Sequence, residues 1–174
     1  LTGSIFAEIN PYKPLVWHTE LGYDISSSRG ERFEPAVRYG NWSRDKNMSS
    51  IQKNDNLFWQ FKNYLTYNGK IGELHNYTAM LGQELWESKW EYQSVSSTGL
   101  PSNDIHNPSL GSDPKISSGF GSAAMASFFG RGTYNYADKY LLSAAIRADG
   151  SSRFGKNNRW GYFPSVSAAW YVSE

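Results

Sequence analysis

The feature that most constrains the fold is a strict two-residue alternation near the end of the chain. Over residues 140–149, one set of alternate positions holds Tyr, Leu, Ala, Ile and Ala, and the other set includes Ser, Arg and Asp. Residues 164–172 alternate in the same way, with Val166 and Trp170 on the apolar side. Successive side chains of a β-strand point to opposite faces, whereas a helix repeats every 3.6 residues. The alternation therefore predicts two strands, each with one apolar face.

These apolar faces could meet lipid or pack against each other. In a transmembrane β-barrel the apolar face contacts lipid and the other face lines the lumen, but a strand of a soluble sandwich alternates identically. We expect the barrel arrangement. The residues expected to face lipid are Leu142, Ile146, Val166 and Trp170, and those expected to face the lumen are Arg147 and Ser167.

The composition favours a barrel wall. Aromatic residues make up 16% of the chain, although its mean hydropathy is −0.60. No apolar run reaches the roughly 18 residues that a membrane-spanning helix needs. Transmembrane strands escape detection by hydropathy, because lipid-facing and lumen-facing residues alternate and aromatic residues gather at the two interfaces.

Several function classes find no support in the sequence. A net charge of +1 gives no electrostatic case for a nucleic-acid partner, and the absence of cysteine removes disulfides and thiolate chemistry. The three histidines, His18, His75 and His106, lie in separate segments without metal-ligand spacing. No G-x-S-x-G motif occurs, and residues 150–156 lack the spacing of a phosphate-binding loop. We therefore expect no enzyme, and no catalytic, cofactor-binding or metal-binding residue.

The whole chain follows the same plan of strands and connections. Strands are predicted at residues 3–10, 15–26, 57–68, 74–92, 123–136, 140–149 and 164–172. The connections are short at Tyr12, at Asn68-Gly69-Lys70 and at Ala137, and a medium loop follows Asp149. Residues 27–54, with a short strand near 37–39, and residues 94–121 are predicted to be long loops. Barrels of bacterial outer membranes have short periplasmic turns and long extracellular loops, so both long loops and the medium loop are expected outside the cell.

Two stretches of the sequence resemble a known family. The longer runs from Tyr136 through residues 162–167 (YFPSVS), and a weaker match covers residues 63–67 (NYLTY) and 75–82 (HNYTAMLG). They resemble the barrel portion of the SusC/RagA-type TonB-dependent outer-membrane transporters of Bacteroidetes-like bacteria. The resemblance covers most of the chain.

The resemblance implies a fold and a function. The fold would be all-β, with about seven antiparallel strands forming part of a wall that closes at about 22 strands around a plug. Residues 1–174 would be a single partial barrel segment, without the plug, a signal peptide or the C-terminal strands. The implied function is import of oligosaccharides or peptides across the Gram-negative outer membrane, energised by the TonB complex through the plug. Membrane lipid and a SusD-like surface lipoprotein would be partners.

Six residues are candidates for contact with the imported solute in the lumen or at its mouth. They are Arg131, Arg147, Asp149, Arg153, Lys156 and Trp160. The first three alternate with the apolar bands, and an ion pair within the wall or a contact to the plug would explain them equally well. Arg153 and Lys156 belong to a polar loop that would reach the outer mouth. Trp160, like Trp42, Trp86 and Trp90, could stack on a sugar ring or belong to an interfacial girdle.

Two competing interpretations remain at the level of sequence. One is a soluble β-sandwich that binds carbohydrate through exposed aromatic residues, with its apolar faces buried in a core. The other is a glycan-active enzyme, which requires paired carboxylates in a cleft. Asp24, Glu84 and Asp149 are available, but nothing in their spacing pairs them.

Overall fold

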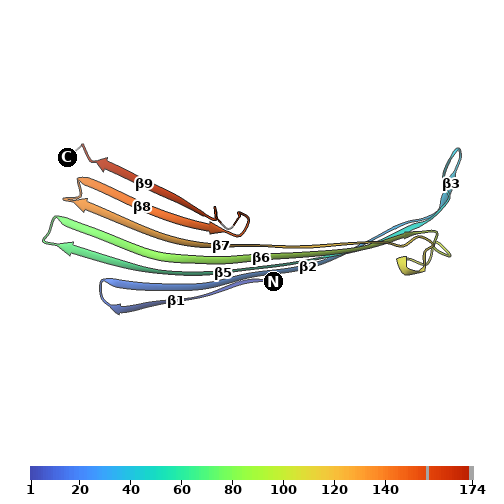
Figure 1. Cartoon of the computed structure of the whole chain (residues 1–174), viewed down its shortest axis with the longest axis horizontal. Helices are drawn as coiled ribbons and strands as arrows, with labels where there is room; N and C mark the ends of the chain where they lie inside the picture. Colours follow the sequence, from blue (N-terminus) through green and yellow to red (C-terminus); the bar gives the residue numbers. More distant parts are fainter. Residues whose placement is uncertain (156, 173–174) are drawn as a thin grey trace. The chain divides into compact units, whose positions relative to one another are not determined.

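The computed structural model describes residues 1–155 and 157–172, and nearly all of its regular structure is antiparallel β-strand. Seven strands form one sheet in the order β1-β2-β5-β6-β7-β8-β9 (Figure 1), and β3 pairs with β4 in a second sheet. The elements are β1 Thr2–Tyr12, β2 Leu15–Glu34, β3 Val37–Tyr39, β4 Trp42–Arg44, β5 Met48–Ile71, β6 His75–Thr98, a 3₁₀ turn η1 Pro108–Leu110, β7 Lys115–Tyr136, β8 Tyr140–Ser151 and β9 Trp160–Trp170. The predicted all-β class with about seven antiparallel strands is confirmed.

The chain divides into two compact units, which we describe separately. The extension unit contains residues 1, 25–57 and 89–122, and the hairpin unit contains residues 2–24, 58–88 and the described residues from 123 onward. Strands β2, β5, β6 and β7 contribute residues to both units. No helix among the described residues is long and apolar enough to cross a membrane.

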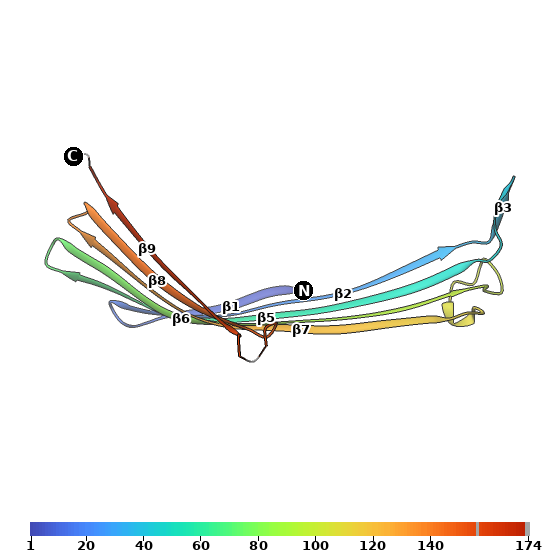
Figure 2. The same cartoon turned by 45° about the horizontal axis from the view of Figure 1, so that its top comes forward.

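Strand register in the hairpin unit shows which residues share a face. On β7 and β8, Phe129 pairs with Arg147, while Phe128 pairs with Ala148 on the other face. Strands β7, β8 and β9 lie side by side in this order (Figures 1 and 2). Between β8 and β9, Ile146 pairs with Pro164, and both residues lie on the apolar face. The predicted division into an apolar and a polar or small face is therefore confirmed for β8 and for residues 164–170 of β9. Phe163, just before the predicted range, pairs with Arg147 and lies on the polar face.

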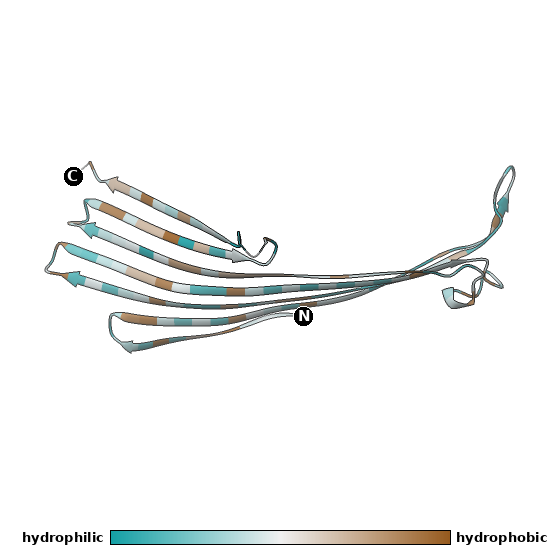
Figure 3. Cartoon of the chain, in the orientation of Figure 1, coloured by the Kyte–Doolittle hydropathy of each residue, from teal (hydrophilic) through white to brown (hydrophobic). Residues whose placement is uncertain are grey.

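The two faces differ in exposure as well as in chemistry. Along β8, the residues Ser143, Ala145, Arg147 and Asp149 of the polar face are half-buried, whereas Leu142 and Ile146 on the apolar face are exposed. Figure 3 shows the alternation of hydrophobic and hydrophilic residues along these strands. Among the described hydrophobic residues only Leu100 and Ala123 are buried, while Val166 is 76% exposed. The apolar face therefore has no core of its own, and the sandwich interpretation, which requires one, is not supported.

Aromatic rings form a belt at the short-turn end of the hairpin unit. Its contacts join Tyr12 to Tyr67, Tyr67 to Tyr77, His75 to Tyr134 and Tyr136, Tyr136 to Tyr140, and Tyr140 to Trp170. These residues come from six strands, β1 and β5 to β9. A row of tyrosines of this kind is typical of the membrane–water interface of a barrel.

The strands in the extension unit are longer than predicted. Residues 27–54 were expected to form a loop, but β2 continues to Glu34 and β5 begins at Met48. Residues 94–121 likewise contain the end of β6 and the start of β7, and only 99–114 lie between these strands. Polar residues sustain the pairing, because Ser27 Oγ donates to Asp55 Oδ1 over 2.6 Å. The predicted short strand at 37–39 is confirmed as β3.

The turn predicted at residues 68–70 is also misplaced. Strand β5 continues through Gly69 to Ile71, and the turn falls at Gly72, whose φ of +61° favours glycine. Gly69 has a different role. A Cβ atom there would overlap the Tyr77 ring, so this glycine makes room for an aromatic side chain from the neighbouring strand.

Candidate functional site

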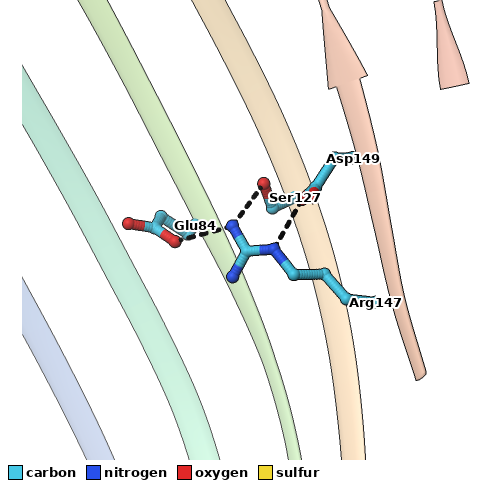
Figure 4. Close-up of polar contacts among 4 residues, drawn as sticks. All are labelled: Glu84, Ser127, Arg147 and Asp149. Carbon is cyan, nitrogen blue, oxygen red and sulfur yellow. Dashed lines mark hydrogen bonds and ion pairs between the residues drawn. The ribbon is translucent and has the colours of Figure 1, made fainter. Parts of the chain in front are cut away.

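Four polar residues meet on the polar face of the hairpin unit (Figure 4). Arg147 on β8 donates from Nε to Asp149 on the same strand over 2.6 Å. Its Nη2 donates to Glu84 on β6 over 3.0 Å and to Ser127 on β7 over 2.9 Å. One guanidinium group thus links three adjacent strands through a fork of donors that carboxylates match well.

The partial burial of this cluster explains why its carboxylates need a cation. Ser127 is fully buried, and the side chains of Glu84 and Asp149 are 18% and 22% exposed, against 38% for Arg147. Half-buried carboxylates need a partner, because desolvation is costly for an unpaired charge. Arg147 supplies that partner to both. The enzyme interpretation is therefore not supported here, since the two carboxylates are bound to a cation rather than facing each other across a cleft.

A row of rings extends the same face toward the N-terminal strands. His18 on β2 stacks on Tyr64 on β5, with ring centroids 4.6 Å apart. The next strand supplies Gly82, where a Cβ atom would lie 2.5 Å from the Phe129 ring and 2.7 Å from Tyr64 Cβ. The Arg147 guanidinium lies 5.8 Å from the centre of the Phe129 ring. Glycine at position 82 therefore lets the two aromatic side chains approach across β6, and the row ends at the Arg147 cluster.

The six candidate residues from the sequence separate into different environments. Arg131 pairs with Ala145 on the polar face and is exposed, and it has no ion pair among the described residues. Arg153 is exposed in the loop after β8, where its backbone N–H donates to Ser151 Oγ over 3.3 Å. Lys156 lies outside the described residues.

Trp160 lies on the opposite face from Arg147. It pairs with Gly150, and its indole stacks on Phe128 with ring centroids 6.0 Å apart. A Cβ atom on Gly150 would lie 2.9 Å from that indole, so the ring lies flat over the glycine.

The structure therefore brings Arg147 and Asp149 into direct contact and places Arg131 on their face, but it does not bring Arg153 or Trp160 to them. Sequence reasoning missed Glu84 and Ser127 as partners of Arg147, because Glu84 is 63 residues away along the chain and only strand register brings it close. Within the part of the chain that the structure describes, no group of three His, Cys, Asp or Glu residues could hold a metal ion.

This two-faced sheet can be compared with known proteins. The family described as "TonB dependent receptor-like, beta-barrel" matches residues 8–174. The chain belongs to this family. Its members are outer-membrane transporters and not enzymes, and the predicted SusC/RagA-type membership is confirmed by the relatives.

Two curated relatives illustrate the similarity. TonB-dependent receptor P26 of Formosa agariphila is 31% identical over 181 residues, which cover 99% of this chain and 18% of that receptor. TonB-dependent receptor SusC of Bacteroides thetaiotaomicron is 48% identical over 50 residues, covering 29% of this chain and 5% of that receptor. The chain thus spans about a fifth or less of the length of these relatives.

Solved structures show the same fold. A structure of the RagAB peptide transporter matches with a TM-score of 0.85 and 28% identity, over 96% of this chain and 19% of that chain. The RagAB peptide importer in its open-open state matches with a TM-score of 0.88 and 29% identity, over 95% and 18%.

Proposed function

We propose that this chain forms a section of the wall of an outer-membrane barrel that imports large nutrients, either oligosaccharides or peptides. The TonB complex would supply energy through a plug, and a SusD-like lipoprotein would cover the mouth. The observation that carries the proposal is the two-faced sheet of the hairpin unit. Most of its exposed large apolar side chains lie on one face, and polar groups are linked on the other, where Phe6, Leu141 and Phe163 are exposed apolar exceptions. Membership of the receptor family supports it.

The apolar residues form a band across the strands, and the band has a boundary at each end, as a surface in contact with lipid would have. The belt of tyrosines supplies one edge at the short turns. At the other end, apolar residues give way to charged or polar ones: Ile25 is followed by Ser27 on β2, and Leu57 by Asp55 on β5. Residues at alternate positions share a face, so each pair marks a change on one surface. We infer that lipid ends there and that residues 27–54 and 94–121 lie outside the cell.

The opposite face would line the lumen. The Arg147 cluster would brace the wall, because its charges are satisfied internally. Arg131 has no ion pair among the described residues, so its guanidinium would be available to a passing solute or to the plug. Arg153 would lie at the outer mouth, and Trp160 in the outer girdle.

Single cysteines in the full-length receptor, in intact outer membranes, test this arrangement. Residues 1–174 contain no native cysteine, so each label reports on one position in this segment. We expect a water-soluble maleimide to modify cysteine at Arg147 and Ser167 through the lumen, and a lipid-soluble probe to modify it at Ile146 and Val166. The reverse pattern would invert the sheet and contradict the proposal.

Epitope tags test the sidedness. Gly40 lies in the turn between β3 and β4, and Asp113 lies in the segment between η1 and β7; both are exposed. Tags inserted there should be detected by antibody on unbroken cells. Detection only after permeabilisation would place the extension unit in the periplasm.

A further inference from the structure

Two aromatic rings lie flat on the sheet of the extension unit. Trp90 and Tyr92 on β6 have ring centroids 6.3 Å apart and planes 16° from parallel. Beneath them, β7 carries Gly121 and Gly119. A Cβ atom on Gly121 would lie 2.7 Å from the Trp90 indole, and one on Gly119 would lie 2.5 Å from the Tyr92 ring. Glycine at both positions thus allows the rings to rest against the backbone of β7 instead of standing on edge.

The outer surface of this pair is open. Trp90 is 46% exposed although one face of its ring is covered by Gly121, and Tyr92 is half-buried. The Tyr92 hydroxyl is 3.1 Å from Ser117 Oγ, which fixes the orientation of its ring. The two rings therefore form a nearly flat, pre-positioned platform, and a ligand that stacks there would lose little side-chain entropy of the protein.

The face that carries the platform can be assigned within the unit. Lys53 on β5 feels the charge of Glu91 on β6, so these two side chains lie on one face. Trp90 and Tyr92 flank Glu91 in sequence and therefore lie on the other face.

The groups around the platform are neutral hydrogen-bonding groups. Asn56 Nδ2 donates to Ser26 Oγ over 3.3 Å, and Asn54 Nδ2 donates to Ser28 Oγ over 3.5 Å. By alternation, these four residues lie on the face opposite Lys53, which is the platform's face. The reverse face is charged: its residues include Arg29, Glu31, Lys53, Asp55 and Glu91.

We propose that Trp90 and Tyr92 bind a neutral oligosaccharide at the outer mouth. The proposal rests on the proposed function and names its substrate class. The C–H face of a sugar ring stacks on an aromatic face, and the flanking amides and hydroxyls can exchange hydrogen bonds with its hydroxyl groups.

Calorimetric titration of the purified full-length receptor tests the platform. The probes are laminarihexaose, xylohexaose, mannohexaose, maltohexaose and a neutral decapeptide. We expect at least one glycan to bind, with roughly 5- to 10-fold weaker affinity in Trp90→Ala, because one stacking contact is lost. Trp90→Phe should retain most of the affinity.

Two further variants distinguish the loss of ring stacking on the glycan from a general loss of folding. Gly121→Ala keeps both rings but pushes the indole off the backbone, so it should also weaken glycan binding. Phe120→Ala removes an exposed ring from the reverse face of the same strand and should leave binding unchanged. If no glycan binds the wild-type receptor, or if Trp90→Ala binds glycan as well as wild type, the platform assignment is wrong. The cysteine accessibility experiment then still decides the proposed function separately.

Discussion

At the scale of single residues, we expect the loss of the Arg147 side chain to lower the local stability of β6, β7 and β8. Arg147→Ala leaves Glu84 and Asp149 half-buried without their cation. We expect a local destabilisation of about 1–2 kcal/mol, below the value for a fully buried pair because solvent reaches Arg147. In hydrogen exchange of the full-length receptor, amides of β6, β7 and β8 should exchange roughly tenfold faster.

Arg131→Ala is the matched control, since Arg131 lies on the same face without an ion pair among the described residues. Its effect on exchange should be small. Adding Glu84→Gln and Asp149→Asn to Arg147→Ala should restore much of the protection by removing the unpaired charges. Equal exchange in Arg147→Ala and Arg131→Ala would show that the cluster does not brace the strands.

The turn between β7 and β8 contains a strained residue. Ala137 and Asp138 have φ values of 54° and 53°, a region that costs an L-residue with a Cβ atom about 1–2 kcal/mol. Asp138 is held by a hydrogen bond from Asn135 Nδ2 over 2.6 Å, but the Ala137 side chain offers no such bond. Ala137→Gly should therefore slow exchange of the Lys139 amide, which donates to Tyr136 across the turn. Faster exchange would mean that the added chain entropy of glycine outweighs the relief of strain.

At the scale of strands, the sequence predicts structure well where one face of a strand is apolar along its length. The alternation fixes the faces of β8 and β9 because each apolar position repeats every second residue. The same signal fades in the polar extensions of β2 and β5, where cross-strand hydrogen bonds hold the pairing and no apolar face is needed. The dipeptide Asn68-Gly69 is typical of a hairpin turn, but here β5 continues through it. Its glycine is explained by the Tyr77 ring that packs over Gly69, which the sequence does not show. For the site, alternation placed Arg147 and Asp149 together but could not supply Glu84, which depends on the register of another strand.

The pairing between β2 and β5 in the extension unit should become less stable in acid. Hydrogen bonds from Lys53 and then Ser27 hold the pKa of Asp55 below its usual 3.8. This carboxylate therefore stabilises the pairing above pH 3.8, and the contribution disappears as the pH falls through its lower folded-state pKa. We expect limited proteolysis of residues 27–54 to speed up below that pH. Asp55→Asn should show faster cleavage already at pH 7, and high salt should narrow the difference because both side chains are exposed. If this variant and the wild type are cleaved at the same rate at pH 7, the Lys53–Asp55 ion pair does not stabilise the pairing of β2 with β5.

At the scale of the whole molecule, the described residues leave their apolar face uncovered, since only Leu100 and Ala123 are buried among their hydrophobic side chains. The first and last strands of the sheet, β1 and β9, each have one neighbour in the seven-stranded order and so present unpaired backbone groups along the other edge. Exposed side chains such as Ile5, Leu81 and Val166 add an apolar surface that a soluble monomer rarely tolerates. We therefore expect the isolated chain to associate in detergent-free buffer and to sediment as a broad distribution of large species in analytical ultracentrifugation. Detergent micelles should narrow that distribution by covering the apolar face. A single sharp monomer peak without detergent would mean that the apolar faces bury one another in solution, and the assignment of that face to lipid would have to be abandoned.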